Sequence, residues 1–300
     1  MIETKGITFK YDGIYGGKYG GVMALNDVSL RIERGLRYAL LGANGAGKTT
    51  FLLHLNGILR PLSGKIFYDG VEVTYGRKAL YDLRRRVGVV FQDPEVQLFS
   101  ATVAEDVSFG PMNLGLSHDE VKRRVEDSLK ACGIYELKDR AVHFLSHGEK
   151  KLAAIAGVIA MEPQVIVLDE PVTGLDHIHR EKVIDIFSGL HGKGVTLIMS
   201  THDTDLAYEW ADRVIVMNNG GVAGVGTPLE IFSDEKLLRS SAIYKPVVLD
   251  IYERLIGRGL LKNKGDIPRV RDDLIRCLEG DTAFSRSTEA ANGRQIEFNR

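Results

Sequence analysis

The stretch Leu41-Gly-Ala-Asn-Gly-Ala-Gly-Lys-Thr-Thr50 decides the fold of this 300-residue chain. The phosphate-loop spacing G-x-x-x-x-G-K-T is filled in it by Gly42, Gly47, Lys48 and Thr49. Glycines let the backbone turn inward so that successive N–H groups point at one anion, and the helix that starts at Lys48 adds its positive end. Apolar runs on both sides predict a buried strand before the loop and a helix after it. The stretch therefore predicts a binding site for the phosphates of a nucleoside triphosphate.

Two carboxylates at the end of an apolar run add the acidic element that phosphoryl transfer needs. The run Val165-Ile-Val-Leu-Asp-Glu170 is typical of a strand buried on both faces, and it ends in Asp169 and Glu170. Asp169 can hold Mg²⁺, usually through water, and Glu170 can accept a proton from the attacking water. Lys48 would neutralise the outer phosphates, and the Thr49 hydroxyl can ligate Mg²⁺. We therefore predict a site for nucleotide hydrolysis.

The composition narrows the class of protein further. The chain is 44% hydrophobic and has a formal net charge of −1, so it can build a sizeable core and offers no basic field for nucleic acid. Cys132 and Cys277 are far apart and have no metal-type spacing, so we expect a reducing compartment and no disulfide. The first residues lack a signal-peptide pattern, and no apolar run is long enough to span a bilayer. We expect a cytoplasmic protein that reaches a membrane only through a partner.

The order of predicted strands and helices is typical of an α/β protein. Antiparallel strands are expected at 7–11 and 28–32, and buried parallel strands at 36–41, 86–91, 165–168 and 195–199. A helical pattern over 102–132 breaks at 115–117. Together these segments predict a mixed, mostly parallel core sheet with an antiparallel β edge and a helical subdomain.

The chain divides into three expected parts. Residues 1–234 would form the nucleotide-binding domain, 235–280 a small helical C-terminal extension, and 281–300 a disordered tail of polar, aperiodic sequence. The extension has two apolar stripes with helical spacing, which are Val248, Ile251 and Leu255, and Val270, Leu274 and Leu278. They predict two short helices, which would either cover the main domain or contact a partner.

Four other features are expected to have structural roles only. Arg84–Arg86 should end a helix, and Cys132 should be a small buried apolar residue. His177 and His179 should begin a solvated helix rather than bind a metal. The Gly/Tyr-rich segment 12–21 should be a long hairpin loop, with a dedicated binding element as the alternative.

Further motifs follow in an order that identifies a family. Leu145-Ser-His-Gly-Glu149 lies between the phosphate loop and the Asp-Glu strand, and Gly174-Leu-Asp176 and Ser200-Thr-His-Asp203 follow it. With a glutamine, Gln92, at the end of the strand predicted at 86–91, this series resembles the ATP-binding-cassette ATPases over residues 1 to about 230. The resemblance implies an α/β cassette fold with a helical signature subdomain.

The resemblance implies roles around the chain's own ATP. Tyr11 would stack on adenine, and His202 would contact the γ-phosphate beside the catalytic Glu170. Gln92 would touch Mg²⁺ and the attacking water and would report to a membrane partner. The phosphates would be cradled by Gly42, Ala43, Asn44, Gly45, Ala46, Gly47, Lys48, Thr49 and Thr50.

The resemblance also implies a site shared between two subunits. Ser146 and Gly148 would contact the γ-phosphate of ATP bound by the opposite subunit, and Asp176 would lie in the turn that links the two. Such cassettes close head to tail over two ATP molecules, so monomers should hydrolyse ATP poorly. The family usually has Leu-Ser-Gly-Gly-Gln, whereas this chain has His147 and Glu149. Glu149 would repel phosphate unless it is protonated or turned away. His147 would add bulk near the phosphate or donate a hydrogen bond to it. We therefore expect a working site with slower turnover.

One segment narrows the resemblance. Phe91-Gln-Asp-Pro94, Gln97-Leu-Phe99 and Val103-Ala-Glu-Asp-Val-Ser-Phe-Gly-Pro111 are similar to the ATPases of energy-coupling-factor transporters, especially the cobalt and nickel type. In that group this segment contacts short coupling helices of a transmembrane energy-coupling subunit. The contact is implied here around 97–99, within a few residues of Gln92. Nucleotide state could then move the partner.

The sequence thus predicts an Mg²⁺-dependent ATPase on the cytoplasmic face of a membrane. It would pair with a second ATPase subunit, either identical or a related paralogue, and with the energy-coupling subunit and a substrate-binding membrane subunit. Cobalt or nickel is the leading solute, and a vitamin or other micronutrient is the second. A slowly hydrolysing regulatory clamp is the rival function, although Glu170, Gln92 and His202 argue against it. A cassette protein of DNA repair or translation is disfavoured, because the chain has no long coiled-coil insertion and no second cassette.

Overall fold

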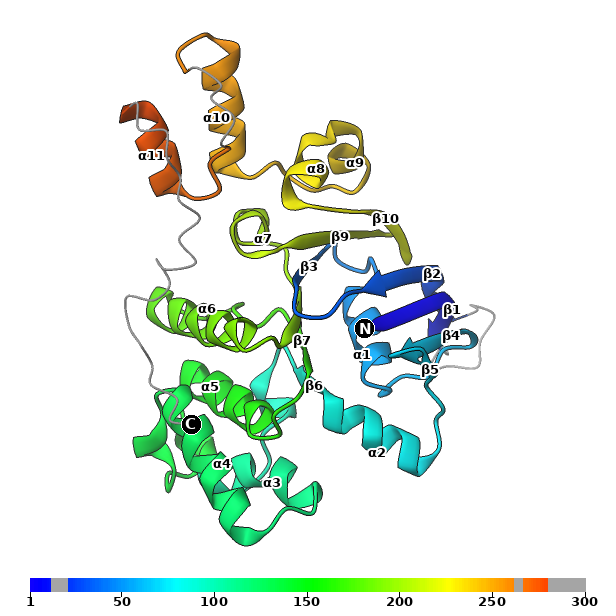
Figure 1. Cartoon of the computed structure of the whole chain (residues 1–300), viewed down its shortest axis with the longest axis vertical. Helices are drawn as coiled ribbons and strands as arrows, with labels where there is room; N and C mark the ends of the chain where they lie inside the picture. The colour runs from blue at the N-terminus through cyan, green and yellow to red at the C-terminus, as the bar shows by residue number, and fades with distance from the viewer. Residues whose placement is uncertain (12–20, 262–266, 280–300) are drawn as a thin grey trace.

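The computed structural model describes residues 1–11, 21–261 and 267–279 of the chain (Figure 1). Apart from Gly21, the Gly/Tyr-rich segment lies outside the described residues, as does the C-terminal tail. Two sheets and a set of helices form the described part, in the α/β arrangement that the sequence predicts.

A six-stranded sheet forms the centre of the molecule. Its order is β10-β9-β3-β8-β7-β6. These strands are β3 (Arg37–Leu41), β6 (Val87–Val90), β7 (Val165–Asp169), β8 (Thr196–Ser200), β9 (Arg213–Asn218) and β10 (Gly221–Gly226). All adjacent pairs are parallel except β9 and β10. Because parallel strands end at the same edge, the residues that follow β3, β6, β7 and β8 all gather there.

An antiparallel sheet and one helix cover one face of the central sheet. The antiparallel sheet has the order β2-β1-β4-β5. Its strands are β1 (Ile2–Tyr11), β2 (Val22–Ile32), β4 (Ser63–Tyr68) and β5 (Val71–Glu72), and the helix is α1 (Lys48–Leu55). One core cluster joins Leu25 of β2, Phe51 of α1 and Leu40 of β3, each 1% exposed or less. This packing fixes α1 directly beside the strand edge.

Helices cover the other face of the central sheet (Figure 1). They are α3 (Val103–Asn113), α4 (His118–Ala131), α5 (His147–Ile159), α6 (His177–Gly192) and α7 (Thr204–Trp210). Leu41, one residue after Leu40 in β3, packs into this second cluster with Ile155 and Phe187, because successive strand residues point to opposite faces. Burial on both faces explains why these strands have continuous apolar runs.

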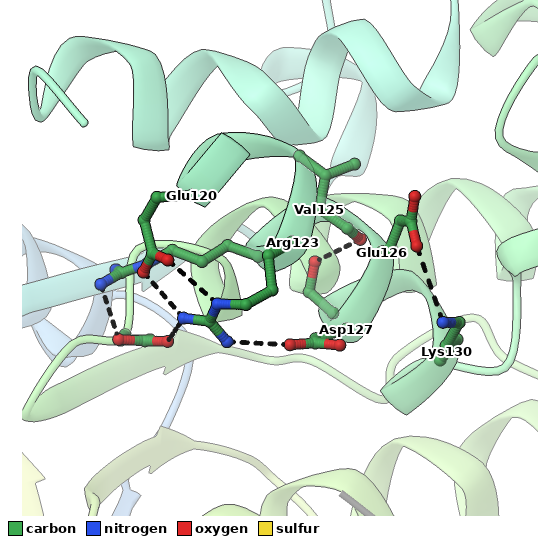
Figure 2. Close-up of polar contacts among 9 residues, drawn as sticks. Glu120, Arg123, Val125, Glu126, Asp127 and Lys130 are labelled. Atoms are coloured by element: carbon green, nitrogen blue, oxygen red, sulfur yellow. Dashed lines mark hydrogen bonds and ion pairs between the residues drawn. The ribbon is translucent and has the colours of Figure 1, made fainter. Parts of the chain in front are cut away.

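A charged network on α4 joins two parts of the helical region. Arg123 and Arg124 both donate to Glu120, whose pKa falls to about 2 through those two hydrogen bonds. Figure 2 shows Arg123 between Glu120 and Asp127, 2.9 Å from the aspartate. Arg124 continues to Glu162, 2.8 Å away beyond the end of α5. Exposed pairs of this kind contribute little stability singly.

Four helices follow the central sheet toward the C-terminus. They are α8 (Pro228–Ser233), α9 (Glu235–Ser240), α10 (Val247–Gly257) and α11 (Arg271–Glu279). The sequence predicts the last two but not α8 or α9. In α10 the buried residues are Leu249 and Tyr252, one position beyond the predicted stripe, and Ile251 is 41% exposed. Arg269 donates to the carbonyl oxygens of Tyr208 and Ala211, which anchors α11 to the end of α7.

The structural roles expected for two sequence features are confirmed. Arg84–Arg86 form the last turn of α2 (Arg77–Arg86), where the negative end of the helix stabilises positive charge. Cys132 is fully buried, and burial raises the pKa of its thiol to about 12. His177 begins α6, and its exposed ring lies 3.1 Å from Glu181. No helix of the described part is long and apolar enough to cross a bilayer.

Candidate nucleotide-hydrolysis site

The phosphate loop connects β3 to α1 and is closed by its own lysine. Gly47 caps α1 with φ at 98°, and a Cβ there would lie 2.5 Å from the carbonyl oxygen of Ala24, so only glycine fits. Lys48 is buried, and its Nζ donates to the carbonyl oxygens of Gly42 and Ala43 at 2.7 and 3.2 Å. Burial lowers the pKa of Lys48, while the nearby carboxylate of Glu170 opposes that change. The lysine therefore lies over the turn formed at Ala43, Asn44, Gly45 and Ala46, in place to meet phosphate.

Asp169 joins three elements at the strand edge. Its Oδ2 accepts from the Thr49 hydroxyl at 2.8 Å, and its Oδ1 accepts from the Ser200 hydroxyl at 2.6 Å. The β7–β8 register places Asp169 opposite Ser200. Ser200 has no role among the sequence predictions, although a serine that ends a strand after three apolar residues was the available signal. Two hard oxygen donors, a hydroxyl and a carboxylate, thus lie together beside the phosphate loop.

Glu170 occupies a strained position next to His202. Its φ of 41° is in the left-handed region, where a non-glycine residue is costly and is held by its surroundings. The Ser200 hydroxyl accepts from the Glu170 N–H at 3.0 Å. Oε2 of Glu170 accepts from the Thr173 hydroxyl at 2.9 Å and lies 3.1 Å from Nδ1 of His202. The structure therefore brings the predicted base and the predicted γ-phosphate contact together, and it adds Thr173, which the sequence analysis missed.

Tyr11 stands at the end of β1 beside the phosphate-loop helix. Its hydroxyl is 3.2 Å from the Thr50 hydroxyl, and 44% of the residue is exposed. Phe9 packs edge-on against Tyr11 on one side and against His54 on the other, with ring centroids 5.0 and 4.8 Å apart. Among the described residues, the Tyr11 ring is therefore partly exposed beside the phosphate-loop helix.

His54 is a buried histidine behind the loop that the sequence analysis did not identify. It is 0% exposed, and Nδ1 lies 2.7 Å from the carbonyl oxygen of Thr50, so Nδ1 carries the proton. Nε2 is buried without a hydrogen-bond partner in the described structure. Burial lowers the pKa of His54, so the ring stays neutral and supports α1 from behind.

Ser146, Gly148 and Asp176 form a second group. Ser146 caps α5, and Asp176 caps α6 by accepting from the N–H of His179 at 2.8 Å. The His179 ring also bonds Asp176 and packs on Gly148, where a Cβ would lie 2.6 Å from that ring. Across residues 1–11, 21–261 and 267–279, no hydrogen bond or ion pair joins this group to the phosphate loop, Asp169 or Glu170.

Gln92 and the predicted partner segment lie beyond β6. Gln92 follows that strand at the same edge as the phosphate loop, and its side chain is exposed. In the segment 97–99 only Phe99 points outward, 65% exposed and edge-on to Phe109 of α3. Leu98 is buried, and the amide of Gln97 makes hydrogen bonds to neighbouring backbone.

The unusual Glu149 has a local partner in this structure. Its Oε2 accepts from the Ser146 N–H at 2.7 Å, while the Ser146 hydroxyl accepts from the Glu149 N–H at 3.3 Å. These two bonds form a capping box, in which glutamate and glutamine serve equally. Arg140 lies 3.5 Å from the other carboxylate oxygen. The backbone hydrogen bond from Ser146 contributes most to the lowered pKa of Glu149, so the carboxylate is charged but turned onto its own helix.

The phosphate loop, the acidic end of β7 and His202 at one strand edge define a P-loop nucleotide hydrolase. Residues 25–173 match the family described as ABC transporter. The chain is 44% identical to the energy-coupling factor transporter ATP-binding protein EcfA of Methanothermobacter thermautotrophicus, across 94% of this chain and 88% of that one. It is 46% identical to the cobalt import ATP-binding protein CbiO of Rhodobacter capsulatus, across 88% and 94%.

Solved structures give the same answer for the fold. cbiO1 from Clostridium perfringens, part of the ABC transporter complex cbiONQ, aligns with a TM-score of 0.70 at 39% identity, over 86% of this chain and 98% of that one. The ATP-binding cassette MJ0796, solved as a dimer after hydrolysis with ADP and phosphate, aligns with a TM-score of 0.68 at 26% identity, over 76% and 99%. The chain belongs to the ATP-binding-cassette ATPases of ABC transporters, of the energy-coupling-factor type, and it is an ATPase.

We expect the folded chain to lose stability in acid through His54. Its folded pKa lies below the unfolded value of about 6.5, so the unfolded chain binds the extra proton and stability falls as pH falls through that value. In urea titrations, His54→Asn keeps a donor near Thr50 but does not titrate. Between about pH 7.5 and 5.5 the parent should lose more stability than this variant, by up to about 1.4 kcal/mol per pH unit. The exposed His118→Asn is the matched control, and equal slopes for parent and His54→Asn would contradict the expectation.

Glu149→Gln should lower the ATP concentration needed for half-maximal hydrolysis. Glutamine completes the same capping box but removes a negative charge beside Ser146. Because Arg140 already offsets part of that charge, we expect a change of only about threefold. Glu149→Ala, which also loses the cap, serves as the comparison and should unfold at lower temperature. A half-maximal concentration equal to or above the parent's would show that the charge does not face phosphate.

Proposed function

We propose that this ATPase powers an energy-coupling-factor importer and that two cassettes close head to tail over two ATP molecules. The proposal rests on one observation, which is that the predicted site residues form two separate groups. Lys48, Asp169 and Glu170 form one linked group, whereas Ser146 and Asp176 are exposed at the starts of two other helices. A second subunit that brings its own Ser146 group against the phosphate loop would complete each site.

Each group supports a definite chemical role. Lys48 and the free N–H groups at the start of α1 would neutralise and orient the phosphates. Thr49 and Asp169 would hold Mg²⁺, since the hydroxyl and carboxylate that now bond each other are ligands that this ion prefers. When bound, Mg²⁺ would offset the charge that develops on the phosphates. Glu170 would take the proton of the attacking water, and His202 would contact the γ-phosphate from the same side.

The surface around Phe99 supports contact with a membrane partner. Phe99 and Phe109 form an exposed aromatic pair, and Val96 and Met112 beside them in sequence are 69% and 64% exposed. Monomeric proteins seldom expose grouped apolar side chains without an interaction to cover them. We assign this surface to the transmembrane energy-coupling subunit, which in turn joins a substrate-binding membrane subunit. The chain would then lie on the cytoplasmic face of the membrane as a peripheral subunit.

Cobalt or nickel is the proposed solute. The support is the relative named as a cobalt import ATP-binding protein and the structure that belongs to a cbiONQ complex. A vitamin or other micronutrient is the second candidate, because several relatives are named only as energy-coupling factor ATPases. Affinity purification of the chain with its membrane subunits, followed by uptake of radioactive cobalt, nickel or vitamins into vesicles, would identify the solute. ATP-dependent uptake of a vitamin and not of the metals would replace the first candidate.

Glu170→Gln should bind ATP normally and hydrolyse it about 10²–10⁴-fold more slowly, because the general base is lost. With turnover blocked, ATP should hold two chains together, seen as an ATP-dependent dimer by size-exclusion chromatography with light scattering. Lys48→Ala is the control, since loss of its cation should abolish tight ATP binding and the dimer together. Normal hydrolysis by Glu170→Gln would assign the base to another residue. Retained ATP affinity in Lys48→Ala would remove the phosphate-loop assignment.

We also propose that residues 235–280 contact a second subunit or the membrane partner. Tyr244, Val247 and Leu278 are 85%, 57% and 56% exposed in this region. A chain that ends at Asp234 should keep the six-stranded sheet but form the ATP-dependent dimer less readily. Sedimentation of the full and shortened chains, both carrying Glu170→Gln, would measure the difference. Equal dimerisation and equal coupling to membrane subunits would instead show that the helices only cover the cassette.

A further inference from the structure

We propose that Lys151 and Gln97 are positioning residues that tie the loop carrying Gln92 to the helix carrying Ser146. The inference rests on the proposed function, because it gives the link a role in closing the shared site. It gives a role to Lys151, which has none in the sequence predictions, and it gives Gln97 a role inside the chain in addition to the partner contact implied for residues 97–99.

The backbone before and at Gln92 is held by side chains rather than by a strand. Nζ of Lys151 donates to the carbonyl oxygen of Phe91 at 3.0 Å and to that of Gln92. Oε1 of Gln97 accepts from the N–H of Phe91 at 3.2 Å. Nε2 of Gln97 donates to the carbonyl oxygen of Ala154, in α5, at 3.0 Å. We call these four hydrogen bonds the polar bracket; Lys151 and Ala154 both belong to α5.

A lysine is energetically unfavourable at the buried position of Lys151. It is 0% exposed, and burial lowers the pKa of its amine to about 8, against the charges of Asp93 and Asp169. In the described structure its bonded partners are carbonyl oxygens and no carboxylate lies within ion-pair distance. Burial of the amine costs desolvation free energy, and its hydrogen bonds to two carbonyl oxygens offset part of that cost. Lys151 therefore fixes the carbonyl oxygens of Phe91 and Gln92 relative to α5.

The polar bracket spans the two halves of the site. One end is the loop at the strand edge beside the phosphate loop, and the other is α5, whose first residues follow Ser146. Lys151 lies little more than one helical turn from Ser146, so the link is short and stiff. A shift of Gln92 toward the chain's own γ-phosphate would therefore move the Ser146 group that meets the opposite nucleotide. The two ATP sites of a dimer would be coupled through each chain's own backbone.

The test uses the full chain with Lys151→Met, which keeps the length of the side chain and removes its donors. Lys130→Met is the control, because Lys130 is an exposed lysine that pairs with Glu126 on its own helix, α4. ATP affinity of the monomer should stay within about twofold in both variants. The kcat of Lys151→Met should fall at least tenfold, with a comparable rise in the ATP concentration that dimerises it in the Glu170→Gln background. Lys130→Met should match the parent in all three measurements.

Gln97→Met provides a second route if Lys151→Met does not fold. It removes the other side of the polar bracket without altering a buried charge, and it should give the same loss of kcat at unchanged affinity. Because both residues act through one link, the double variant should lose no more activity than the worse single variant. Unchanged kcat and dimerisation in folded Lys151→Met or Gln97→Met would overturn the inference. Failure of the Glu170→Gln parent itself to dimerise with ATP would instead overturn the proposed function.

Discussion

The Asp169 carboxylate accepts one hydrogen bond from Thr49 on α1 and another from Ser200 on β8. Both donors reach it because parallel strands end at a common edge and α1 is packed between two sheets. The carboxylate is buried, so losing either donor would leave an acceptor without water and cost about 1–3 kcal/mol. The position of the phosphate loop relative to the acidic strand thus depends on this interaction.

The backbone strain at Glu170 arises at the same edge of the central sheet, where β7 ends. The chain must leave β7 sharply to keep the Glu170 side chain beside His202, and its φ of 41° is the consequence. The Ser200 hydroxyl, which donates to Asp169, also accepts from the Glu170 N–H and so stabilises both residues of the acidic pair. Ser200 therefore has a larger structural effect than its single hydroxyl suggests. Replacing it would loosen Asp169 and Glu170 together.

The parts of the site that sequence reasoning predicts are those set by local spacing. The phosphate loop, the Asp169–Glu170 pair and His202 each follow a strand at a fixed interval, and the fold brings them to one edge. Thr173 and Lys151 act through partners in space, so a single sequence offers little to distinguish them, whereas Ser200 is marked only by its place at the end of a strand. The α10 stripe was misplaced by one residue because a short helix takes its orientation from its neighbours rather than from its own periodicity.

Glu149 shows how a departure from a family motif acquires a local explanation. The spacing Ser146-x-x-Glu149 is a capping box that could have been read from the sequence, and it uses the N–H groups of Ser146 and Glu149. The N–H groups between them remain at the positive end of α5, where an anion is favoured. The glutamate charge lies at that same end, where it is favoured in the single chain, and in the proposed dimer it would compete with an incoming phosphate. Under the proposed function, the charge that is favoured at the start of α5 in the single chain would therefore weaken the contact of this helix with a second subunit's nucleotide.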